Sequence, residues 1–451
     1  MRNSTLRFFC CGGFLNYLTE VFNEECPEPS ASSQQKLDVY FETQLVGKIA
    51  SADGVGMNFS YADSWRNDKA SFPISVSIPL NAPSIENEAA NNFFANLLPE
   101  EQVRRRTCKK LGISEGNHFE LLKRIGGDCA GALTIVQEKA KPPTLQDEYT
   151  PISELQLADW SKGDQYAFAQ VAGEQDVRLS LAGAQDKLPV KVVNGQQFYL
   201  PTGNSPSTQI LKFASHFSHL PENETFTTML ARAVGVDTVD ISLYQTNEAR
   251  IAVIQRYDRQ INNQQCKRIH QEDFCQALGV HPERKYQQEG GPRLQDCINL
   301  IKDACSVPLI ELEKFVRWTL FNWLAFNADA HAKNISLLFV DGQTKLTPFY
   351  DLVCTGNYPQ LSKDLAMSIG GEFLPGAVHV KHLQRFADEL DMSYSYVNRM
   401  ACITLERLQD SMDQTIIQFK DLYGDSPILQ RVPVVIKKRC KGALKDSLSK
   451  S

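Results

Sequence analysis

The chain has 451 residues, a formal net charge of −6 and a hydrophobic fraction of 42%, enough for two or three lobes that each bury a core. The mild acidity argues against non-specific nucleic-acid binding by the whole surface and leaves room only for local basic patches. The 12 cysteines include no C-x-x-C pair, which argues against a zinc ribbon, and their scatter is typical of buried thiols in a reducing cytosol.

Residues 1–35 predict an N-terminal extension, because they end in the linker-like run Pro27–Gln35. Their apolar run, Phe8–Phe14, has a weak basic flank and no clear cleavage site, so it is a poor signal peptide. The longest apolar segment, Phe315–Phe326, spans 12 residues, fewer than the roughly 20 that cross a bilayer. We therefore expect a soluble cytoplasmic protein that does not enter a membrane.

Strand patterns dominate the next part of the chain and predict an α+β subdomain over residues 36–145. Short alternating segments separated by turns are followed by a basic helical segment. The expected strands are Leu37–Phe41, Val46–Ile49, Met57–Tyr61 and Ile74–Ile78, and the expected helix is Asn91–Lys110.

The order of elements between residues 146 and 258 is that of a protein-kinase N-lobe. Asn194-Gly195 predicts a type I′ hairpin, and Lys212 lies in the apolar strand that follows. The expected strands are Pro189–Val193, Gln196–Leu200, Thr208–Ala214, Val239–Tyr244 and Arg250–Tyr257, with a helix from Glu222 to Gly235 after the third of them.

Helical periodicity after Asp258 predicts a helical C-lobe over residues 259–425. Residues 426–451 are interpreted as a basic, solvated tail. Together these elements predict an α+β, two-lobed, protein-kinase-like fold with a mixed α/β N-terminal part and an all-helical C-terminal lobe. The expected helices are Glu272–Leu278, Leu294–Ile301, Pro308–Phe326, Lys381–Leu390 and Tyr396–Tyr423.

An Asp–Asn–Asp arrangement is the clearest sign of chemistry. Asp329 and Asn334 have the spacing of the kinase catalytic loop, and Asp351 lies beyond a short strand. In that chemistry one carboxylate accepts the proton of the attacking hydroxyl, while the Asn and the second carboxylate hold Mg²⁺ against the phosphates. The apolar helix before Asp329 delivers these side chains from the core, where a metal and phosphates would satisfy them.

His331 lies between these residues and leaves two interpretations open. It orients Asp329 or the loop backbone, or it is a structural histidine with satisfied hydrogen bonds. A His-ligated zinc site is disfavoured because only His331 lies nearby in the sequence.

Lys212 predicts a contact with nucleotide phosphates. In this interpretation it pairs with an acid of the following helix, for which Glu224 is preferred and Glu222 is the alternative. The competing interpretation is a strand-edge lysine that reaches water.

Two further segments fit a nucleotide site. Small residues around Gly183 would let backbone N–H groups approach phosphates. Gln255–Asp258 end the last strand of the expected N-lobe, where a kinase hinge binds adenine through backbone groups. Arg256 and Asp258 fit a structural ion pair equally well.

A series of short motifs is spread over most of residues 36–425. The motifs are Asn92–Glu100, Ile125–Ala132, Leu179–Lys187, Pro206–Lys212, Arg256–Arg259, His270–Gln276, Lys285-Tyr286 with Gly290–Pro292, Asp329–Asn334 and Tyr350-Asp351. In this order they resemble the HipA family, the toxin kinases of bacterial HipBA toxin–antitoxin modules.

The resemblance implies an N-terminal α+β part and a helical C-terminal part with ATP between them, and a serine/threonine kinase that uses ATP and Mg²⁺. It implies an aminoacyl-tRNA synthetase as protein substrate, notably glutamyl-tRNA synthetase, whose inactivation halts translation and causes growth arrest or persistence. The implied partners are a HipB-like helix-turn-helix antitoxin and, through it, operator DNA.

The resemblance also assigns roles to single residues. Asp329 is the catalytic base with His331 beside it, and Asn334 and Asp351 are the Mg²⁺ ligands. Ser180 is the autophosphorylated serine, whose phosphate would add about −2 charge next to the nucleotide and expel the loop. The ATP-binding residues are Ala182, Gly183, Ala184, Gln185, Asp186, Lys187, Lys212, Gln255 and Tyr257.

The chain departs from the family pattern in three places. Gln255 replaces the usual hinge Glu, Phe326 stands where a Gly commonly precedes the Asn, and residues 1–35 have no counterpart.

Two other functions stay open as alternatives. Phosphatidylinositol kinases share the Asp-x-His-x-x-Asn spacing of Asp329, His331 and Asn334, so a lipid kinase is one of them. A catalytically weak, DNA-binding co-repressor that acts with an antitoxin is the other. The full motif set argues against the lipid kinase, and retention of the catalytic set together with Lys212 argues against the co-repressor.

Overall fold

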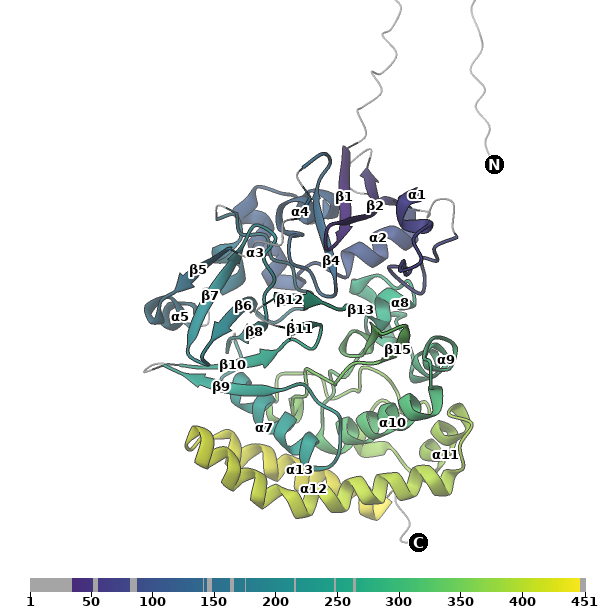
Figure 1. The fold of residues 1–451 in the computed structure, drawn as a ribbon. Coiled ribbons are helices and arrows are strands. Elements are labelled where there is room, and N and C mark those ends of the chain that lie inside the picture. The colour runs from purple at the N-terminus through teal and green to yellow at the C-terminus, as the bar shows by residue number, and fades with distance from the viewer. Residues whose placement is uncertain are drawn as a thin grey trace, which may run out of the picture. The chain divides into compact units, whose positions relative to one another are not determined.

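The computed structural model describes residues 35–51, 56–81, 87–140, 142–143, 148–162, 166–174, 176–214, 216–246, 249–262 and 265–446. The predicted extension of residues 1–35 lies outside these ranges except for Gln35. From Gln35 onward the chain mixes sheets and helices, in agreement with the predicted α+β class (Figure 1).

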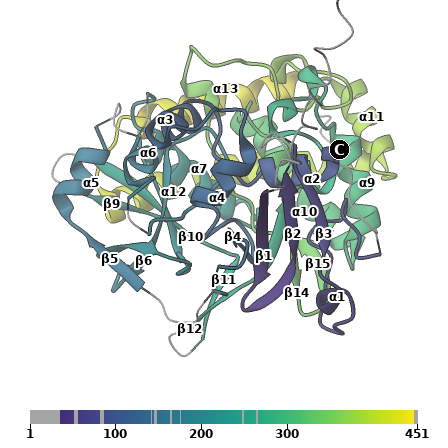
Figure 2. The ribbon, with the colours of Figure 1, turned by 90° about the horizontal axis from the view of Figure 1, so that it is seen from above.

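A four-stranded antiparallel sheet in the order β3-β2-β1-β4 begins the described chain. Its strands lie side by side in Figure 2, and Leu37, Val39 and Ile49 are fully buried in its core. The strands are β1 (Gln35–Phe41), β2 (Gln44–Ser51), β3 (Asn58–Tyr61) and β4 (Leu133–Gln137). The helices of this part are α1 (Asp63–Arg66), α2 (Asn87–Ala95), α3 (Glu101–Leu111) and α4 (His118–Ile125).

The predicted strand Ile74–Ile78 is wrong. These residues form a turn in which the N–H of Ile78 donates to the carbonyl of Ser75 at 3.0 Å. The N–H of Val76 donates to Oε1 of Glu272, 196 residues away, at 2.9 Å. A tertiary contact therefore fixes this turn, and alternation in the local sequence cannot indicate it.

Glu272 makes the stability of the protein depend on pH. Its side chain is fully buried, and burial raises its pKa from 4.5 to about 8. Between these values the unfolded state binds fewer protons than the folded state, so stability falls as pH rises. The variant Glu272→Gln has no ionisable group at this position. The Tm of the variant minus the Tm of wild type should therefore be larger at about pH 8 than at about pH 5, by at least about 2 °C. Thermal unfolding at both pH values measures the difference, and a constant difference would contradict the expectation.

The predicted helix Asn91–Lys110 is interrupted and forms parts of α2 and α3. Pro99 has no N–H to donate and disfavours the helical conformation at Leu98. The break places Glu100 immediately before α3 and lets Pro99 form a parallel bridge with Gly183.

A six-stranded antiparallel sheet follows in the order β5-β7-β6-β8-β10-β9. Asn194 and Gly195 have φ values of 52° and 72°, as a type I′ turn requires, so the predicted hairpin is confirmed. The strands are β5 (Glu148–Ile152), β6 (Lys187–Val193), β7 (Gln197–Thr202), β8 (Gln209–Lys212), β9 (Ile241–Gln245) and β10 (Arg250–Gln255). The helices are α5 (Glu154–Trp160), α6 (Ala167–Val171) and α7 (Leu220–Ala233), of which α7 packs on β9 and β10.

Two small sheets follow the six-stranded sheet. The strands are β11 (Arg259–Asn262), β12 (Gln265–Arg268), β13 (His270–Asp273), β14 (Ser336–Val340) and β15 (Gln343–Leu346). The predicted helix Glu272–Leu278 is wrong in its first part, because β13 pairs with β14 there. Asp273 then caps the short helix α8 (Phe274–Ala277) by accepting the N–H of Gln276 at 2.9 Å.

The remaining predicted helices are confirmed with small shifts of their ends. They gather at the opposite end from β1–β4 in Figure 1, and α10 packs against α9, α12 and α13. Their bounds are α9 (Leu294–Ala304), α10 (Pro308–Ala325), α11 (Val380–Glu389) and α12 (Tyr394–Tyr423). The 3-10 turns are η1 (Pro282–Arg284), η2 (Gln287–Glu289), η3 (Ala332–Asn334), η4 (Thr355–Asn357) and η5 (Pro375–Ala377).

The predicted solvated tail is wrong for residues 428–446, which form helix α13 (Ile428–Asp446). An apolar stripe at helical spacing packs into the core, and it consists of Val432, Ile436, Cys440 and Ala443. The composition of this segment is rich in basic residues, and it therefore predicts a solvated tail although the apolar stripe is present. Among the described helices, none combines the length and apolar character needed to cross a bilayer.

Candidate active site

Helix α10 places the candidate catalytic loop. The helix is buried along most of its length and ends at Phe326, whose φ of 56° turns the chain out of the helix. Asn327 then fixes the loop from inside. Its Nδ2 donates to Oδ1 of Asn322 at 2.8 Å, and its Oδ1 accepts the N–H of Asp329 at 3.2 Å.

The backbone explains why glycine suits position 326. A positive φ costs an L-residue roughly 1–2 kcal/mol, which glycine avoids. The ring of Phe326 packs on Gly356, where an added Cβ would lie 2.6 Å from Cδ1 of the ring. The Phe326 carbonyl also accepts from the N–H of Gly356 at 3.1 Å and from the hydroxyl of Thr355 at 3.0 Å. The ring contact is the one that a glycine at position 326 would lack, whereas the carbonyl would accept both hydrogen bonds from either residue.

Asp329 faces the cavity with a half-exposed side chain. The Tyr286 hydroxyl donates to its Oδ1 at 2.8 Å, and Nδ2 of Asn334 donates to its backbone carbonyl at 3.1 Å. These two hydrogen bonds fix both the carboxylate and the backbone of Asp329. A base that receives a hydroxyl proton must be held in position in this way.

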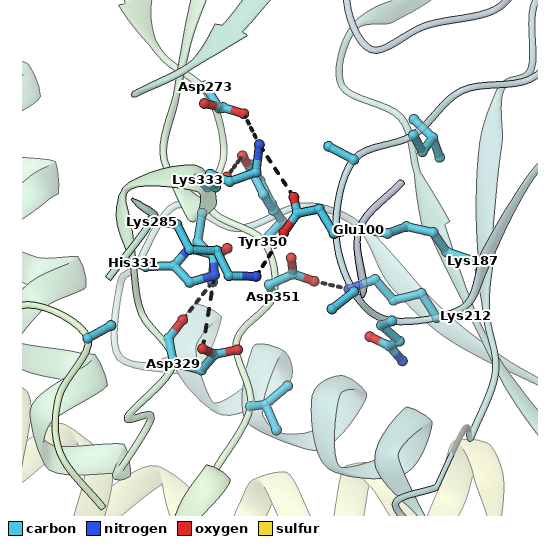
Figure 3. A pocket seen from close by; sticks show the side chains of 18 of the residues that line it. Glu100, Lys187, Lys212, Asp273, Lys285, Asp329, His331, Lys333, Tyr350 and Asp351 are labelled. Carbon is cyan, nitrogen blue, oxygen red and sulfur yellow. Dashed lines mark hydrogen bonds and ion pairs between the residues drawn. The ribbon is translucent and has the colours of Figure 1, made fainter. Parts of the chain in front are cut away.

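His331 lies beside Asp329, but no hydrogen bond joins the two side chains. Nε2 of His331 is 4.0 Å from Oδ1 of Asp329 (Figure 3). Burial lowers the pKa of His331 to about 4, so the ring is neutral at pH 7. The ring packs edge-on against Tyr286, with centroids 5.4 Å apart. Nδ1 of the ring is buried without a hydrogen-bond partner among the described residues. The geometry therefore supports neither direct orientation of Asp329 nor a structural histidine with satisfied hydrogen bonds.

Lys212 at the end of β8 is buried between two acids. Nζ lies 2.6 Å from Oε1 of Glu224 on α7 and also contacts Asp351, toward which it points in Figure 3. Glu222 instead lies 2.9 Å from Nδ1 of His219. The preferred partner Glu224 is therefore confirmed, and Lys212 is not a strand-edge lysine that reaches water.

Asn334 and Asp351 are the candidate metal ligands, and both line the cavity. Asp351 has a φ of 55°, a strained conformation of the kind that persists at functional sites. An amide oxygen and a carboxylate suit Mg²⁺, which takes few protein ligands and fills the other positions with phosphate oxygens and water. The donor set therefore fits Mg²⁺ bound together with a nucleotide.

The candidate phosphate loop lines the cavity at Ala182, Gly183, Ala184 and Gln185, together with Lys187 at the start of β6. The carbonyl of Gly183 accepts the N–H of Glu100 at 3.1 Å, which holds the loop against the start of α3. Burial lowers the pKa of Lys187 to about 8. A phosphate group would favour the charged form of this lysine.

Asp186 lies outside the cavity, contrary to the predicted contact with the nucleotide. Its carboxylate is buried and accepts the N–H groups of Ala167 and Phe168 at 2.6 and 3.1 Å. It therefore caps the start of α6 and anchors the loop from behind.

Ser180 is also outside the cavity and is fully buried. Its hydroxyl donates to the carbonyl of Leu97 at 2.7 Å, and its N–H donates to the carbonyl of Asp128 at 3.0 Å. A kinase could reach this hydroxyl only after the loop had moved.

The candidate hinge brings Gln255 and Tyr257 to the cavity wall. Oε1 of Gln255 accepts from Nε2 of Gln209 on the neighbouring strand at 2.7 Å, a contact that a Glu in this place would make equally well. Arg256 and Asp258 form a buried ion pair at 2.7 Å, which confirms the structural reading of those two residues.

Apart from Asp186 and Ser180, the predicted site residues surround one cavity of about 670 Å³, within the range of roughly 300–1,000 Å³ of small-molecule sites. Sequence reasoning assigned no role to several charged and polar residues of its wall, which are Glu100, Asp273, Lys285, Tyr286 and Lys333. Each belongs to one of the short family motifs, which was the only signal in the sequence that could have found them.

Comparison with known proteins gives matches along most of the chain. A model of the HipA-like C-terminal domain matches residues 179–416, and a model of the HipA N-terminal domain matches residues 37–136. Protein Y4mE of Sinorhizobium fredii is 36% identical over 399 residues, which cover 86% of this chain and 94% of that protein.

The serine/threonine-protein kinase toxin HipA of Shewanella oneidensis is 29% identical over 411 residues, which cover 88% of this chain and 93% of that protein. The solved complex of Shewanella oneidensis HipA, HipB and operator DNA contains a chain of similar structure. The TM-score is 0.79 at 27% identity, over 90% of this chain and 96% of that chain. This likeness confirms the predicted fold class.

Proposed function

Because the chain belongs to the HipA family, we propose that it is an ATP- and Mg²⁺-dependent protein serine/threonine kinase and the toxin of a toxin–antitoxin module. One observation carries the proposal: Asp329, Lys212, Asn334 and Asp351, which come from three separate segments, line a single cavity of nucleotide size. Kinases divide phosphoryl transfer among the same residue types.

The geometry of the cavity wall supports the following roles. Asp329 accepts the proton of the attacking serine hydroxyl, whose oxygen forms a bond to the γ-phosphorus as the bond to the ADP oxygen breaks. Lys212, which Glu224 keeps in place, would neutralise phosphate charge when a nucleotide is bound. Mg²⁺ held by Asn334 and Asp351 would offset the charge of the transferred phosphoryl group.

We propose an aminoacyl-tRNA synthetase, of the glutamyl-tRNA synthetase class, as the protein substrate. The proposed partners are a HipB-like antitoxin and, through it, operator DNA. The similarity to a chain from the Shewanella oneidensis HipA, HipB and operator DNA complex supports the partners. The substrate rests on the family resemblance alone.

The proposed autophosphorylation of Ser180 gives the most direct test. Purified protein with Mg²⁺ and labelled ATP should become labelled at Ser180, whereas Ser180→Ala should keep its fold and take up no label at this position. The substitution removes one buried hydrogen bond, which costs about 1 kcal/mol. Phosphopeptide mass spectrometry locates the label.

Intact mass must be measured first, because protein already phosphorylated at Ser180 could take up no further label there. Wild-type protein that starts unmodified, incorporates no phosphate and shows no ATP-dependent shift on phosphate-affinity gels would overturn the kinase assignment.

A further inference from the structure

Glu100 reaches the candidate active site from the α+β part of the chain. It stands between α2 and α3, and its carboxylate lies between two lysines. Oε2 is 2.8 Å from Nζ of Lys285, and Oε1 is 3.6 Å from Nζ of Lys333. Nζ of Lys333 is also 2.9 Å from Oδ2 of Asp273. We call Glu100, Asp273, Lys285 and Lys333 the Glu100 cluster, which Figure 3 shows beside Asp329.

The Glu100 cluster is buried and balanced in charge. It contains two carboxylates and two ammonium groups, and the side chain of Glu100 is only 10% exposed. Burial alone would raise the pKa of Glu100, but Lys333 and Lys285 hold it at about 2. Glu100 is therefore a permanent anion whose position fixes both lysines.

Each lysine of the cluster is next to a residue with a proposed role in the reaction. Lys285 precedes Tyr286, whose hydroxyl donates to Asp329 at 2.8 Å. Lys333 lies in η3 immediately before Asn334, the candidate metal ligand. The carboxylate of Glu100 thus holds both lysines in place. The residue after Lys285 contacts the proposed base, and the residue after Lys333 is a candidate metal ligand.

Glu100 also holds the phosphate loop, through its backbone N–H and the carbonyl of Gly183 at 3.1 Å. The Tyr286 segment is fixed on its other side as well. The N–H of Gln287 donates to the carbonyl of Ala366 at 3.0 Å, and Oε1 of Gln287 accepts the N–H of Ser368 at 2.7 Å. Glu100 adds a further restraint on this segment through its ion pair with Lys285.

We propose that Glu100 is a positioning residue that aligns Asp329 and Asn334 with the phosphate loop, so that the α+β part of the chain completes the kinase active site. This inference rests on the proposed kinase function. A displacement of about 1 Å at a reacting group can cost on the order of 100-fold in rate, so loss of the cluster should reduce turnover while nucleotide binding persists.

The test must separate alignment from folding. Glu100→Gln alone leaves an excess positive charge in a buried cluster, which could unfold the protein. The double variant Glu100→Gln/Lys285→Met removes one charge of each sign and restores the balance. We expect it to unfold within a few degrees of wild type, to bind MgATP with a Kd within about threefold of wild type, and to phosphorylate at a rate at least about tenfold lower.

Glu120→Gln is the matched control, because Glu120 also pairs with two cations, Lys123 at 2.9 Å and Arg124 at 3.6 Å, but lies outside the cavity on α4. This variant should keep the wild-type rate. The measurements are initial rates of phosphate transfer, MgATP binding by calorimetry and thermal unfolding.

Three results would count against the proposal. If wild type phosphorylates and the double variant matches its rate, the positioning role fails and the kinase function stands. A parallel loss of MgATP affinity and rate would make Glu100 a binding residue instead. If wild type binds MgATP but transfers no phosphate, the proposed function is wrong, and the positioning role that depends on it is wrong as well.

Discussion

Asp329→Asn should reduce the rate of phosphate transfer by about 100- to 10,000-fold, the usual contribution of a positioned general base. The amide keeps the size of the carboxylate and can still accept the hydrogen bond of the Tyr286 hydroxyl, which donates to Oδ1 at 2.8 Å in wild type. It cannot take up the proton of the attacking serine. Because Lys212, Asn334 and Asp351 are untouched, MgATP should bind as in wild type.

Initial rates with labelled ATP, together with calorimetric binding of MgATP, measure both parts of this expectation. Asp341→Asn is a suitable control, because Asp341 is exposed in the turn between β14 and β15. If Asp329→Asn transfers phosphate at the wild-type rate, Asp329 is not the general base.

The same variant links chemistry to physiology. Expression of wild type should arrest growth, whereas Asp329→Asn should not. Phosphoproteomics after induction, compared between the two proteins, would identify the substrate. Arrest of equal strength by both proteins would separate toxicity from phosphate transfer.

Asp128→Asn should destabilise the folded protein by about 3–5 kcal/mol, as expected when one partner of a buried ion pair is removed. Oδ1 of Asp128 lies 2.8 Å from Nη2 of Arg259 and 3.2 Å from Nη2 of Arg268, and Oδ2 lies 3.1 Å from Nη1 of Arg256. These side chains are almost fully buried. Without the carboxylate, Asp258 still pairs with Arg256 and Arg259.

The midpoint of urea unfolding measures the loss. Asp240→Asn is the matched control, because Asp240 pairs with Arg232 at 3.0 Å but its side chain is 82% exposed. Such a surface pair contributes about 0–1 kcal/mol. Similar midpoints for the two variants would show that the buried network does not stabilise the fold.

The elements that sequence could predict are those with a local cause. Asn194-Gly195 adopts the positive φ values that a type I′ turn needs, whatever surrounds it. Local sequence also indicates the spacing from Asp329 to Asn334 and the strand that carries Lys212. The structure brings all three residues to one cavity.

The features that sequence could not predict depend on distant partners. Val76 donates to Glu272 across 196 residues, and the Glu100 cluster unites four segments of which none is unusual alone. The family resemblance assigns Asp186 to the phosphate loop, but its carboxylate accepts two N–H groups of α6 and lies outside the cavity.

The network around Asp128 has a consequence for synthesis of the protein. Its arginine partners Arg256, Arg259 and Arg268 lie 128, 131 and 140 residues further along the chain. At about 5–20 residues per second, the ribosome needs on the order of 10 seconds to supply them after Asp128 has been made. A product of interrupted translation that ends before Arg256 therefore lacks the counter-ions of its own core. For a protein proposed to halt translation, this order of assembly means that the network cannot form before the ribosome has made Arg268.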